Sequence, residues 1–420
     1  MFRTLLATSV AAAALISGAA FAATTFTANG GGSSLAAPTY IAEYQKITAT
    51  QPKALYSYEA VGSGSGQNAF LDNDISLFEN LGSGILTYGT IVGTTVHFGA
   101  SDAYLVASQL TNPATGSYGL SSVDGPLIQL PTIGVGVAMA YNYPSEKTVD
   151  LTDDQVCGIL SGKLTNWSQV VPGASGNITV IYRSDGSGTT FLTTQHLNAV
   201  CTSSNSSFPV LPVPITKTFA SIFTNSTPPA NFVGESGSQA VAVEGVAVPQ
   251  SFTYLSPDYT DIAPKSANAT TLQVAYVLNP NDGVYYQPTV TNTLTGLANP
   301  GPNSTDPTPP ETKTAAQNPL NWVPSIPTTT TGYSIVGYTT VLISSCYANK
   351  TIGKVVGGWL NAQYFDKPYQ TIIVNNGFAP LPNTAAAPFA SAIKEIFLTN
   401  KSKFGLDIDD AKTCSAYAGR

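Results

Sequence analysis

The sequence predicts an α/β fold divided between two domains. Short apolar runs of strand length are repeatedly followed by a turn rich in Gly and Ser and then by a helical pattern, an alternation typical of parallel sheets covered by helices. The chain has 420 residues, which is long for a single domain. Because 43% of the residues are hydrophobic and only 10% are charged, the chain can bury a large core.

Strands and helices can be placed from apolar spacing and from the residues that end each run. The strands are expected at residues 55–61, 95–98 and 178–183, before turns at 62–64, 99–102 and 185–188. Helices are expected where apolar residues recur about every 3.6 positions, several of them after a Ser, Thr or Asp. These helices span residues 38–47, 67–71, 152–160, 190–199 and 387–398.

The composition changes between residues 291 and 331. This stretch is rich in Pro, Thr, Asn and Ser and has little periodicity, so it predicts a long loop or insertion. Strand and helix patterns resume at Ser334. No repeat with a fixed period is visible, which excludes solenoids and propellers.

Residues 1–23 have the pattern of a secretory signal peptide. Arg3 precedes an apolar run that includes Leu15 and Ile16, and the segment ends in the small-x-small pattern A-F-A at 20–22. A membrane helix is the alternative, but the run is shorter than the ~20 residues that a span needs. We therefore expect cleavage and a mature protein that is periplasmic or released.

The charge of the chain excludes nucleic acid as a partner. The formal net charge is -7, and the 17 basic residues are spread thinly along the sequence. Binding to nucleic acid requires a basic stripe or patch, which this distribution does not provide.

The cysteines predict two disulfides rather than a metal site. There are four: Cys157, Cys201, Cys346 and Cys414. An even count in an exported chain is typical of disulfides, and pairing each cysteine with its neighbour in sequence closes two loops of moderate length. Each bridge would stabilise the fold by ~4 kcal/mol. Zinc is the alternative, but no Cys-x-x-Cys pair occurs, and His97 and His196 lack ligand spacing. We expect no metal and no cofactor.

Several strand-to-helix turns share a design that suits an anion. Gly lets the backbone approach a ligand closely, and the first turn of a helix presents unpaired N–H groups at the positive end of its dipole. A single Gly-Ser-Gly turn is usually only a turn. The recurrence of such turns, in a particular order, therefore carries the argument.

Four of these segments resemble, in their order and in their amino-acid sequences, segments of the phosphate-binding proteins of bacterial phosphate-specific ABC transporters. They read GGGSSLAAPTY at 30–40, VGSGSG at 61–66, FGASD at 98–102 and RSDGSGTT at 183–190. Two further segments, QLPT at 129–132 and SGKLTNW at 161–167, match in position. The resemblance implies a type II periplasmic-binding-protein fold, in which two α/β lobes with mixed, mainly parallel sheets close on a ligand about a hinge.

A narrower resemblance is to the DING branch of that family, named for an N-terminal Asp-Ile-Asn-Gly. The corresponding TANG at 27–30 keeps only half of this motif. Better matches are YLSPDY at 254–259, GYTT at 337–340 leading to CYAN at 346–349, PLP at 380–382, and the placement of the four cysteines. The chain departs from the branch at Asp185 and Gly186, where many DING proteins have Glu-Ser, and follows the transporter pattern there.

The resemblance implies eight phosphate-binding residues, four from each lobe. They are Ser34, Leu35, Ser63 and Asp102 in the first lobe, and Arg183, Ser187, Gly188 and Thr189 in the second. Hydroxyl and backbone N–H groups would donate to the phosphate oxygens, and Arg183 would supply the only formal positive charge. One guanidinium does not balance a dianion, so peptide dipoles must supply the rest. Asp185 would orient Arg183 and partly neutralise it.

Asp102 would accept a hydrogen bond from a protonated phosphate. Sulfate carries no such proton at neutral pH, so it would leave a buried carboxylate facing an oxyanion, a penalty that discriminates by ~10⁴-fold or more. The alternative roles are a helix cap for Asp102 and an ordinary turn for Asp185.

Three functions fit these residues. The resemblance implies a monomeric exported protein that binds inorganic phosphate with high affinity and delivers it to an ABC-type permease or scavenges it outside the cell. Some DING proteins are described as alkaline phosphatases, but such an enzyme needs an activated nucleophile or a metal-bound water. The chain has no Gly-x-Ser-x-Gly motif, and GILSGK at 158–163 is one residue short of a nucleotide-binding loop and lacks its final Ser or Thr. A secreted surface-interaction protein that keeps the fold is the third possibility, favoured by the many Thr, Ser and Asn residues.

The expected lobes divide the chain into three parts. Lobe I should comprise residues 24–128 and 332–420, and lobe II should comprise residues 129–331 with the insertion. Phosphate would lie between the lobes, where closure excludes water and strengthens each hydrogen bond.

Overall fold

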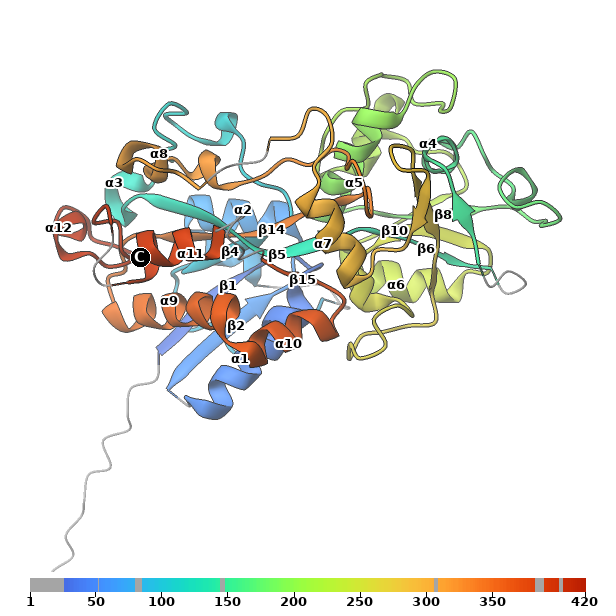
Figure 1. Ribbon diagram of the computed structural model, residues 1–420. Helices are drawn as coiled ribbons and strands as arrows, with labels where there is room; N and C mark the ends of the chain where they lie inside the picture. The colour runs from blue at the N-terminus through green and yellow to red at the C-terminus, as the bar shows by residue number, and fades with distance from the viewer. Residues whose placement is uncertain are drawn as a thin grey trace, which may run out of the picture.

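Two large sheets form the centres of two lobes (Figure 1), and two neighbouring segments of the chain pass between them. The computed structural model describes residues 26–51, 53–79, 85–143, 148–305, 309–381, 389–399 and 403–420. The expected signal peptide lies outside the described residues. Elements from the beginning and the end of the chain form one lobe, and elements from the middle form most of the other.

The first lobe is built on a seven-stranded sheet with the order β15-β5-β14-β4-β1-β2-β3. Its strands are β1 (Phe26–Gly32), β2 (Ala54–Glu59), β3 (Thr87–Tyr88), β4 (Phe98–Ser101), β5 (Leu127–Gly136), β14 (Val336–Ser344) and β15 (Ala379–Pro380). β1 is parallel to β2 and β4, whereas β14 is antiparallel to β4 and β5. The sheet is mixed, as expected, but not mainly parallel, because β5 and β14 carry the chain to the second lobe and back and so run in opposite directions.

Helices pack around this sheet. They are α1 (Ala37–Thr50), α2 (Ser63–Asp72), α3 (Ser121–Asp124), α9 (Lys350–Phe365), α10 (Lys367–Asn375), α11 (Phe389–Ile393) and α12 (Ala411–Cys414), with short turns η1 (Ile75–Phe78), η2 (Ala107–Gln109) and η8 (Lys394–Leu398). Tyr40 and Tyr44 lie one turn apart on α1, and the Trp359 ring on α9 lies 5.2 and 5.1 Å from theirs. This aromatic cluster fixes α1, and hence the loop before it, against the sheet.

The second lobe is built on a five-stranded sheet with the order β11-β6-β10-β8-β9. Its strands are β6 (Ala138–Asn142), β8 (Thr179–Arg183), β9 (Phe232–Glu235), β10 (Ser251–Leu255) and β11 (Gln273–Val274). A three-stranded sheet adds β7 (Asp150–Leu151), β12 (Tyr276–Asn279) and β13 (Val284–Tyr286). The helices are α4 (Asp153–Leu160), α5 (Gly188–Val200) and α6 (Gly237–Ala247), with turns η3 (Trp167–Gln169), η4 (Phe219–Ile222), η5 (Thr224–Ser226) and η6 (Pro257–Tyr259).

The two crossings lie side by side. Val137 joins β5 to β6, and its N–H donates to the Ile335 carbonyl, which precedes β14 (2.9 Å). The Tyr333 hydroxyl donates to the Val137 carbonyl (2.5 Å). The chain therefore leaves the first lobe at Val137 and not at the expected boundary after Ile128. Residues 127–141 are buried throughout, and this one extended segment serves both sheets as β5 and β6.

The segment expected to be a loop or insertion contains regular elements. α7 (Val290–Ala298), α8 (Lys313–Gln317) and the turn η7 (Pro319–Trp322) occupy it. α7 packs on β5 and β14, and the buried Trp322 contacts Phe389 and Phe397 of the first lobe. Much of residues 290–322 therefore packs on the first lobe, although it was expected in the second. α7 has apolar residues at helical spacing, Val290, Leu294 and Leu297, and its packing on the first lobe stabilises this short helix.

Two helices begin, and one strand ends, at positions that sequence patterns placed in turns. α2 begins at Ser63 instead of Gln67, and Gly62 before it has a φ of 89°, which favours Gly. α5 begins at Gly188, two residues earlier than expected. β4 contains Gly99, Ala100 and Ser101, which pair with β14. Gly-rich strands and first helical turns resemble turns in sequence, so the structure shifts each boundary toward the glycines.

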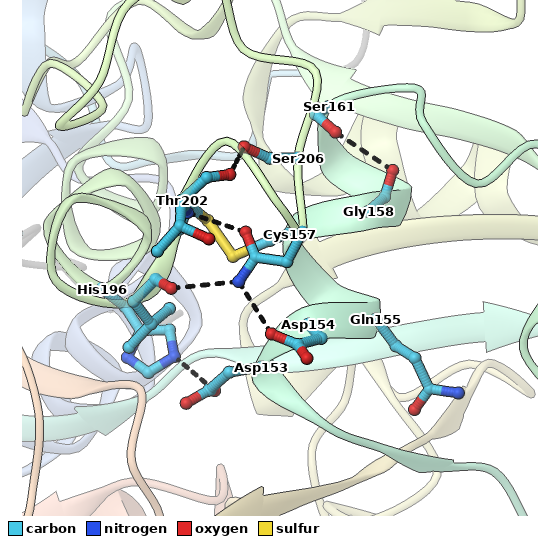
Figure 2. Close-up of a disulfide and its surroundings, with 12 residues drawn as sticks. Asp153, Asp154, Gln155, Cys157, Gly158, Ser161, His196, Thr202 and Ser206 are labelled. Carbon is cyan, nitrogen blue, oxygen red and sulfur yellow. Dashed lines mark hydrogen bonds and ion pairs between the residues drawn. A yellow bond between two sulfur atoms is a disulfide. The ribbon is translucent and has the colours of Figure 1, made fainter.

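Both expected disulfides are formed. Cys157 of α4 pairs with Cys201, which ends α5, and Cys346 pairs with Cys414 of α12. Figure 2 shows that the first bridge lies beside the contact between His196 of α5 and Asp153 of α4. The bridge and this contact tie α4 to α5, the helix whose first turn enters the candidate site.

Candidate functional site

The candidate site lies where the lobes meet, and helix N-termini from both lobes face it. In the first lobe, the loop after β1 leads into α1, and Gly62 leads into α2. In the second lobe, α5 and α6 begin directly after the loops that follow β8 and β9. Each helix start presents backbone N–H groups that have no acceptor within the helix. Four such starts together make a region of positive potential.

Asp102 is the centre of the first lobe's contribution. It follows β4, is 2% exposed, and its Oδ1 accepts from Ser33 Oγ (2.6 Å) and from Thr339 Oγ1 of β14 (2.7 Å). Its Oδ2 has only a longer contact from Ser63 Oγ (3.3 Å), which itself accepts from the Asp102 N–H (3.0 Å). One carboxylate oxygen is thus fully engaged within the lobe, and the other has acceptor capacity to spare.

Burial raises the pKa of Asp102 above its usual range, while the hydrogen bonds from Ser33 and Thr339 and the charge of Arg183 act against that rise. The Asp102 pKa is therefore set by competition between desolvation and its donors. Such a carboxyl can share a proton with an oxyanion that approaches Oδ2.

Arg183 is the buried cation of the second lobe. It ends β8, is 2% exposed, and makes a bidentate pair with Asp185 through Nε and Nη2 (2.6 and 2.5 Å). Its Nη1 donates to Ser238 Oγ on α6 (3.1 Å). Burial acts to lower the Arg183 pKa, but Asp185 outweighs this effect and raises it, so the guanidinium stays charged. Asp185 also accepts from the Gly237 N–H (3.1 Å), which fixes the pair against α6.

The first turn of α5 completes the second lobe's contribution. Ser187 caps the helix, because its Oγ accepts from the Thr190 N–H (3.1 Å), and its hydroxyl hydrogen remains available. Thr189 Oγ1 is buried and has no hydrogen-bond partner among the described residues. A buried hydroxyl without a partner is costly, and a bound anion would satisfy it.

The two lobes touch directly around these groups. The Gly64 N–H donates to the Gly186 carbonyl (2.7 Å), and Ser238 N–H donates to Ser34 Oγ (3.2 Å). Gly188 lies so close to the other lobe that a Cβ built on it would clash with Ser63 Oγ and come within 2.6 Å of Asp102. The structure is therefore of the closed form, in which the two sets of donors face each other.

The structure brings all eight residues named from sequence to this junction, and it adds three. The eight are Ser34, Leu35, Ser63, Asp102, Arg183, Ser187, Gly188 and Thr189. Ser33, Ser238 and Thr339 were not named, although they hold Asp102 and Arg183 in place. Ser33 and Thr339 lie in motifs that match the family, so the sequence could have suggested them as site residues. Ser238 lies in no such motif, and its contacts with Arg183 and Ser34 join residues far apart in the sequence.

No group of three or more His, Cys, Asp or Glu among the described residues could hold a metal ion. None of the helices in the described ranges is long and apolar enough to cross a membrane. A cavity of about 680 Å³ lies along α9, lined by Lys350, Asn361 and Phe397 among others, and none of the eight residues lines it. The two lobes are already closed over the candidate site. The site is therefore defined by the side chains that meet there and not by an open cavity.

A family model of the PBP superfamily domain matches residues 9–319. The chain belongs to the PBP superfamily. Its relatives within that superfamily include the alkaline phosphatase L of Pseudomonas aeruginosa strain PAO1, which is 33% identical over 98% of both chains. They also include a phosphate-binding protein from an unknown prokaryotic organism, 32% identical over 92% of this chain and 98% of the relative.

Solved structures of phosphate-binding proteins have a similar fold over most of the chain. A phosphate-binding protein from Stenotrophomonas maltophilia has a TM-score of 0.75 and 30% identity, and the match covers 94% of this chain and 99% of that one. A high-affinity periplasmic phosphate-binding protein, PfluDING, solved with phosphate bound, has a TM-score of 0.74 with the same identity and coverage. The expected two-lobed fold and the resemblance to DING proteins are thus confirmed.

Proposed function

We propose that this protein binds one inorganic phosphate ion between its lobes, outside the cytoplasm. The observation that carries the proposal is the arrangement around Asp102, a buried carboxylate that faces an arginine and a helix N-terminus of the opposite lobe. An acceptor among so many donors suits an oxyanion that carries a proton, which phosphate does at neutral pH. The phosphate-binding names of the relatives support the same ligand.

Each of the eight residues has a role in this proposal. Ser34, Ser63, Ser187 and Thr189 donate hydroxyl hydrogens, and Leu35, Gly188 and Thr189 donate backbone N–H groups. Arg183 supplies charge, oriented by Asp185, and Asp102 accepts the phosphate proton at Oδ2. Closure excludes water, so each of these bonds is stronger than it would be in an open cleft.

The place of the protein in the cell follows from the same proposal. Residues 1–23 act as a cleaved signal peptide, and the mature protein is a periplasmic or released monomer. It delivers phosphate to an ABC-type permease of the inner membrane or scavenges it outside the cell. The curated relatives named as phosphate-binding protein PstS support this assignment.

Titration calorimetry of the mature protein tests the ligand. Phosphate should bind with 1:1 stoichiometry, arsenate should compete because it has the same shape and protonation, and sulfate should not compete at neutral pH. Absence of binding at millimolar phosphate would refute the proposal.

A phosphatase is the second candidate, favoured by the name of the Pseudomonas aeruginosa relatives. The site offers hydroxyls but no activating histidine. His97 Nδ1 accepts from the Asn29 N–H (2.9 Å), and His196 pairs with Asp153 (3.0 Å), so both are engaged elsewhere. The PBP superfamily and its fold are those of a binding protein. Hydrolysis of a chromogenic phosphomonoester without added zinc, lost in Asp102→Asn, would support the enzyme instead.

A further inference from the structure

A lysine that no sequence motif singled out lies at the junction of the lobes. Lys217 belongs to the second lobe, in the segment between α5 and η4. Its carbonyl accepts from the Ser187 N–H (2.8 Å), so its backbone supports the residue that caps α5. Its side chain reaches the other lobe, where Nζ donates to Gln67 Oε1 on α2. Lys217 thus contacts the anion-binding turn of one lobe and a helix of the other.

Gln67 connects this contact to Asp102. Gln67 is fully buried, and its Nε2 donates to Ser101 Oγ (2.9 Å) and to the Ala103 carbonyl (2.5 Å). A carbonyl can only accept, which fixes the orientation of the amide and turns Oε1 toward its donors, Lys217 and Gln109 (3.0 Å). Lys217 therefore binds the side chain that contacts both neighbours of Asp102, Ser101 through its hydroxyl and Ala103 through its carbonyl.

The charge of Lys217 is not balanced in the way that Arg183 is. Arg183 forms a bidentate pair with Asp185 in its own lobe, whereas none of the ion pairs among the described residues includes Lys217. Lys217 is partly buried, and this burial lowers its pKa because desolvation disfavours the charged ammonium. An unbalanced cation in such surroundings acts on a nearby anion over a longer range than an exposed one.

We propose that Lys217 is an interlobe latch that slows the release of bound phosphate. The donor and the acceptor stand on different lobes, so their bond exists only in the closed form and must break before the ligand leaves. The charge of Lys217 adds to that of Arg183 in holding a dianion. Lys217 acts as a positioning residue, through Ser187 and Gln67, without touching the ligand. The inference rests on the proposed function and adds a determinant of the dissociation rate.

Stopped-flow kinetics of phosphate binding test the latch. Lys217→Met keeps the length of the side chain but removes its charge and its hydrogen bonds, so phosphate should dissociate about tenfold faster. The association rate should change little, because the bond is absent in the open form. Lys217→Arg keeps a positive charge and N–H donors, so phosphate should dissociate from it about as slowly as from the wild type. Lys354→Met, which removes an exposed lysine of α9, is the matched control and should behave like the wild type.

Each outcome separates the latch from the proposed function. An unchanged dissociation rate in Lys217→Met, with phosphate binding intact, would overturn the latch alone. A slower association rate with an unchanged dissociation rate would also overturn the latch, because the charge of Lys217 would then act only by attracting phosphate to the open site. Failure of the wild type to bind phosphate would overturn the proposed function itself. Should Lys217→Met fold poorly, Lys217→Gln removes the charge with a polar side chain and should give the same acceleration.

Discussion

At the scale of single residues, Asp102 shows how a carboxylate can distinguish one oxyanion from another. Its two oxygens are unequal, because Oδ1 receives two short hydrogen bonds and Oδ2 only a longer one. The short bonds hold the side chain in one orientation. Oδ2 is therefore left with acceptor capacity, and in the proposed function it discriminates against ligands that have no hydrogen to donate.

Substituting Asp102 with Asn should weaken ion selectivity more than phosphate affinity. The Asn oxygen can still accept from Ser33 and Thr339, which places the amide NH2 where Oδ2 was and turns an acceptor into a donor. Sulfate then loses its penalty, and the ratio of phosphate to sulfate affinity should fall by about 100-fold. Competition calorimetry measures both constants. Equal losses of affinity for phosphate and for sulfate would contradict the proposal that Asp102 recognises the phosphate proton.

His196 carries a charge for structural reasons. Its Nε2 faces Asp153 Oδ1 (3.0 Å) and its Nδ1 faces the Pro327 carbonyl (3.1 Å), and both partners can only accept. Only the imidazolium donates from both nitrogens. Burial alone would lower the His196 pKa, but Asp153 and Pro327 outweigh it and raise the pKa above its usual range. Figure 2 shows the His196–Asp153 contact beside the disulfide.

The stability contributed by His196 should depend on pH with a definite sign. Because the folded pKa is raised, the contribution is complete below the unfolded pKa of ~6.5 and is lost as pH rises through the folded pKa. His196→Gln should therefore lower the free energy of unfolding by about 2 kcal/mol near pH 5.5, and by less at higher pH. Urea unfolding across this range measures the difference from wild type.

His97 provides an internal control with the opposite sign. Burial, together with the charge of Arg420, lowers the pKa of His97 to about 4. Its contribution is thus present above pH ~6.5 and is lost as the pH falls. His97→Gln should cost less at low pH than at neutral pH. The same trend in both variants would show that the assigned charge states are wrong.

At the scale of elements, the position at which each helix begins matters more for the candidate site than the length of the helix. α2 and α5 approach each other end-on from different lobes, with Gly62, Gly64 and Gly188 at the closest points. These glycines leave the space in which backbone donors from both helices can reach one ligand. The elements that position the site are therefore the strand-to-helix turns, which the sequence identified by composition although it misplaced their boundaries.

Replacing Gly188 with Ala should prevent full closure without disturbing α5. A Cβ there would clash with Ser63 and Asp102 of the opposite lobe, yet Ala is a better helix former than Gly. Phosphate affinity should fall by about tenfold or more, while the thermal stability of the ligand-free protein should not fall. Gly357→Ala on α9 is the matched control, because a Cβ there meets Ile408 at an ordinary 3.7 Å. A ligand-free Gly188→Ala protein that is itself unstable would contradict this account.

At the scale of the whole molecule, the two segments that pass between the sheets, at Val137 and before β14, join the lobes along one edge. Val137 is hydrogen-bonded to Tyr333 and to Ile335, so the crossings lie beside each other. A rotation about this region can open the site while each sheet stays intact. The interlobe bonds of Gly64, Ser238 and Lys217 lie at the junction that such a rotation would separate.

The sequence by itself determined the α/β class, the two-lobed fold, the disulfide pairing and the segments that meet at the site. The α/β class follows from local spacing and the disulfide pairing from the number and order of the cysteines, whereas the two-lobed fold and the segments of the site follow from the resemblance to phosphate-binding proteins. Only the tertiary structure decided where the chain crosses between lobes, how residues 290–322 pack, and which side chains hold Asp102 and Arg183. Thr339 and Asp102 are 237 positions apart, Ser34 and Ser238 are 204 apart, and Lys217 and Gln67 are 150 apart. The first of these contacts arises from strand packing within one lobe and the other two from the packing of one lobe against the other, and no local pattern encodes them.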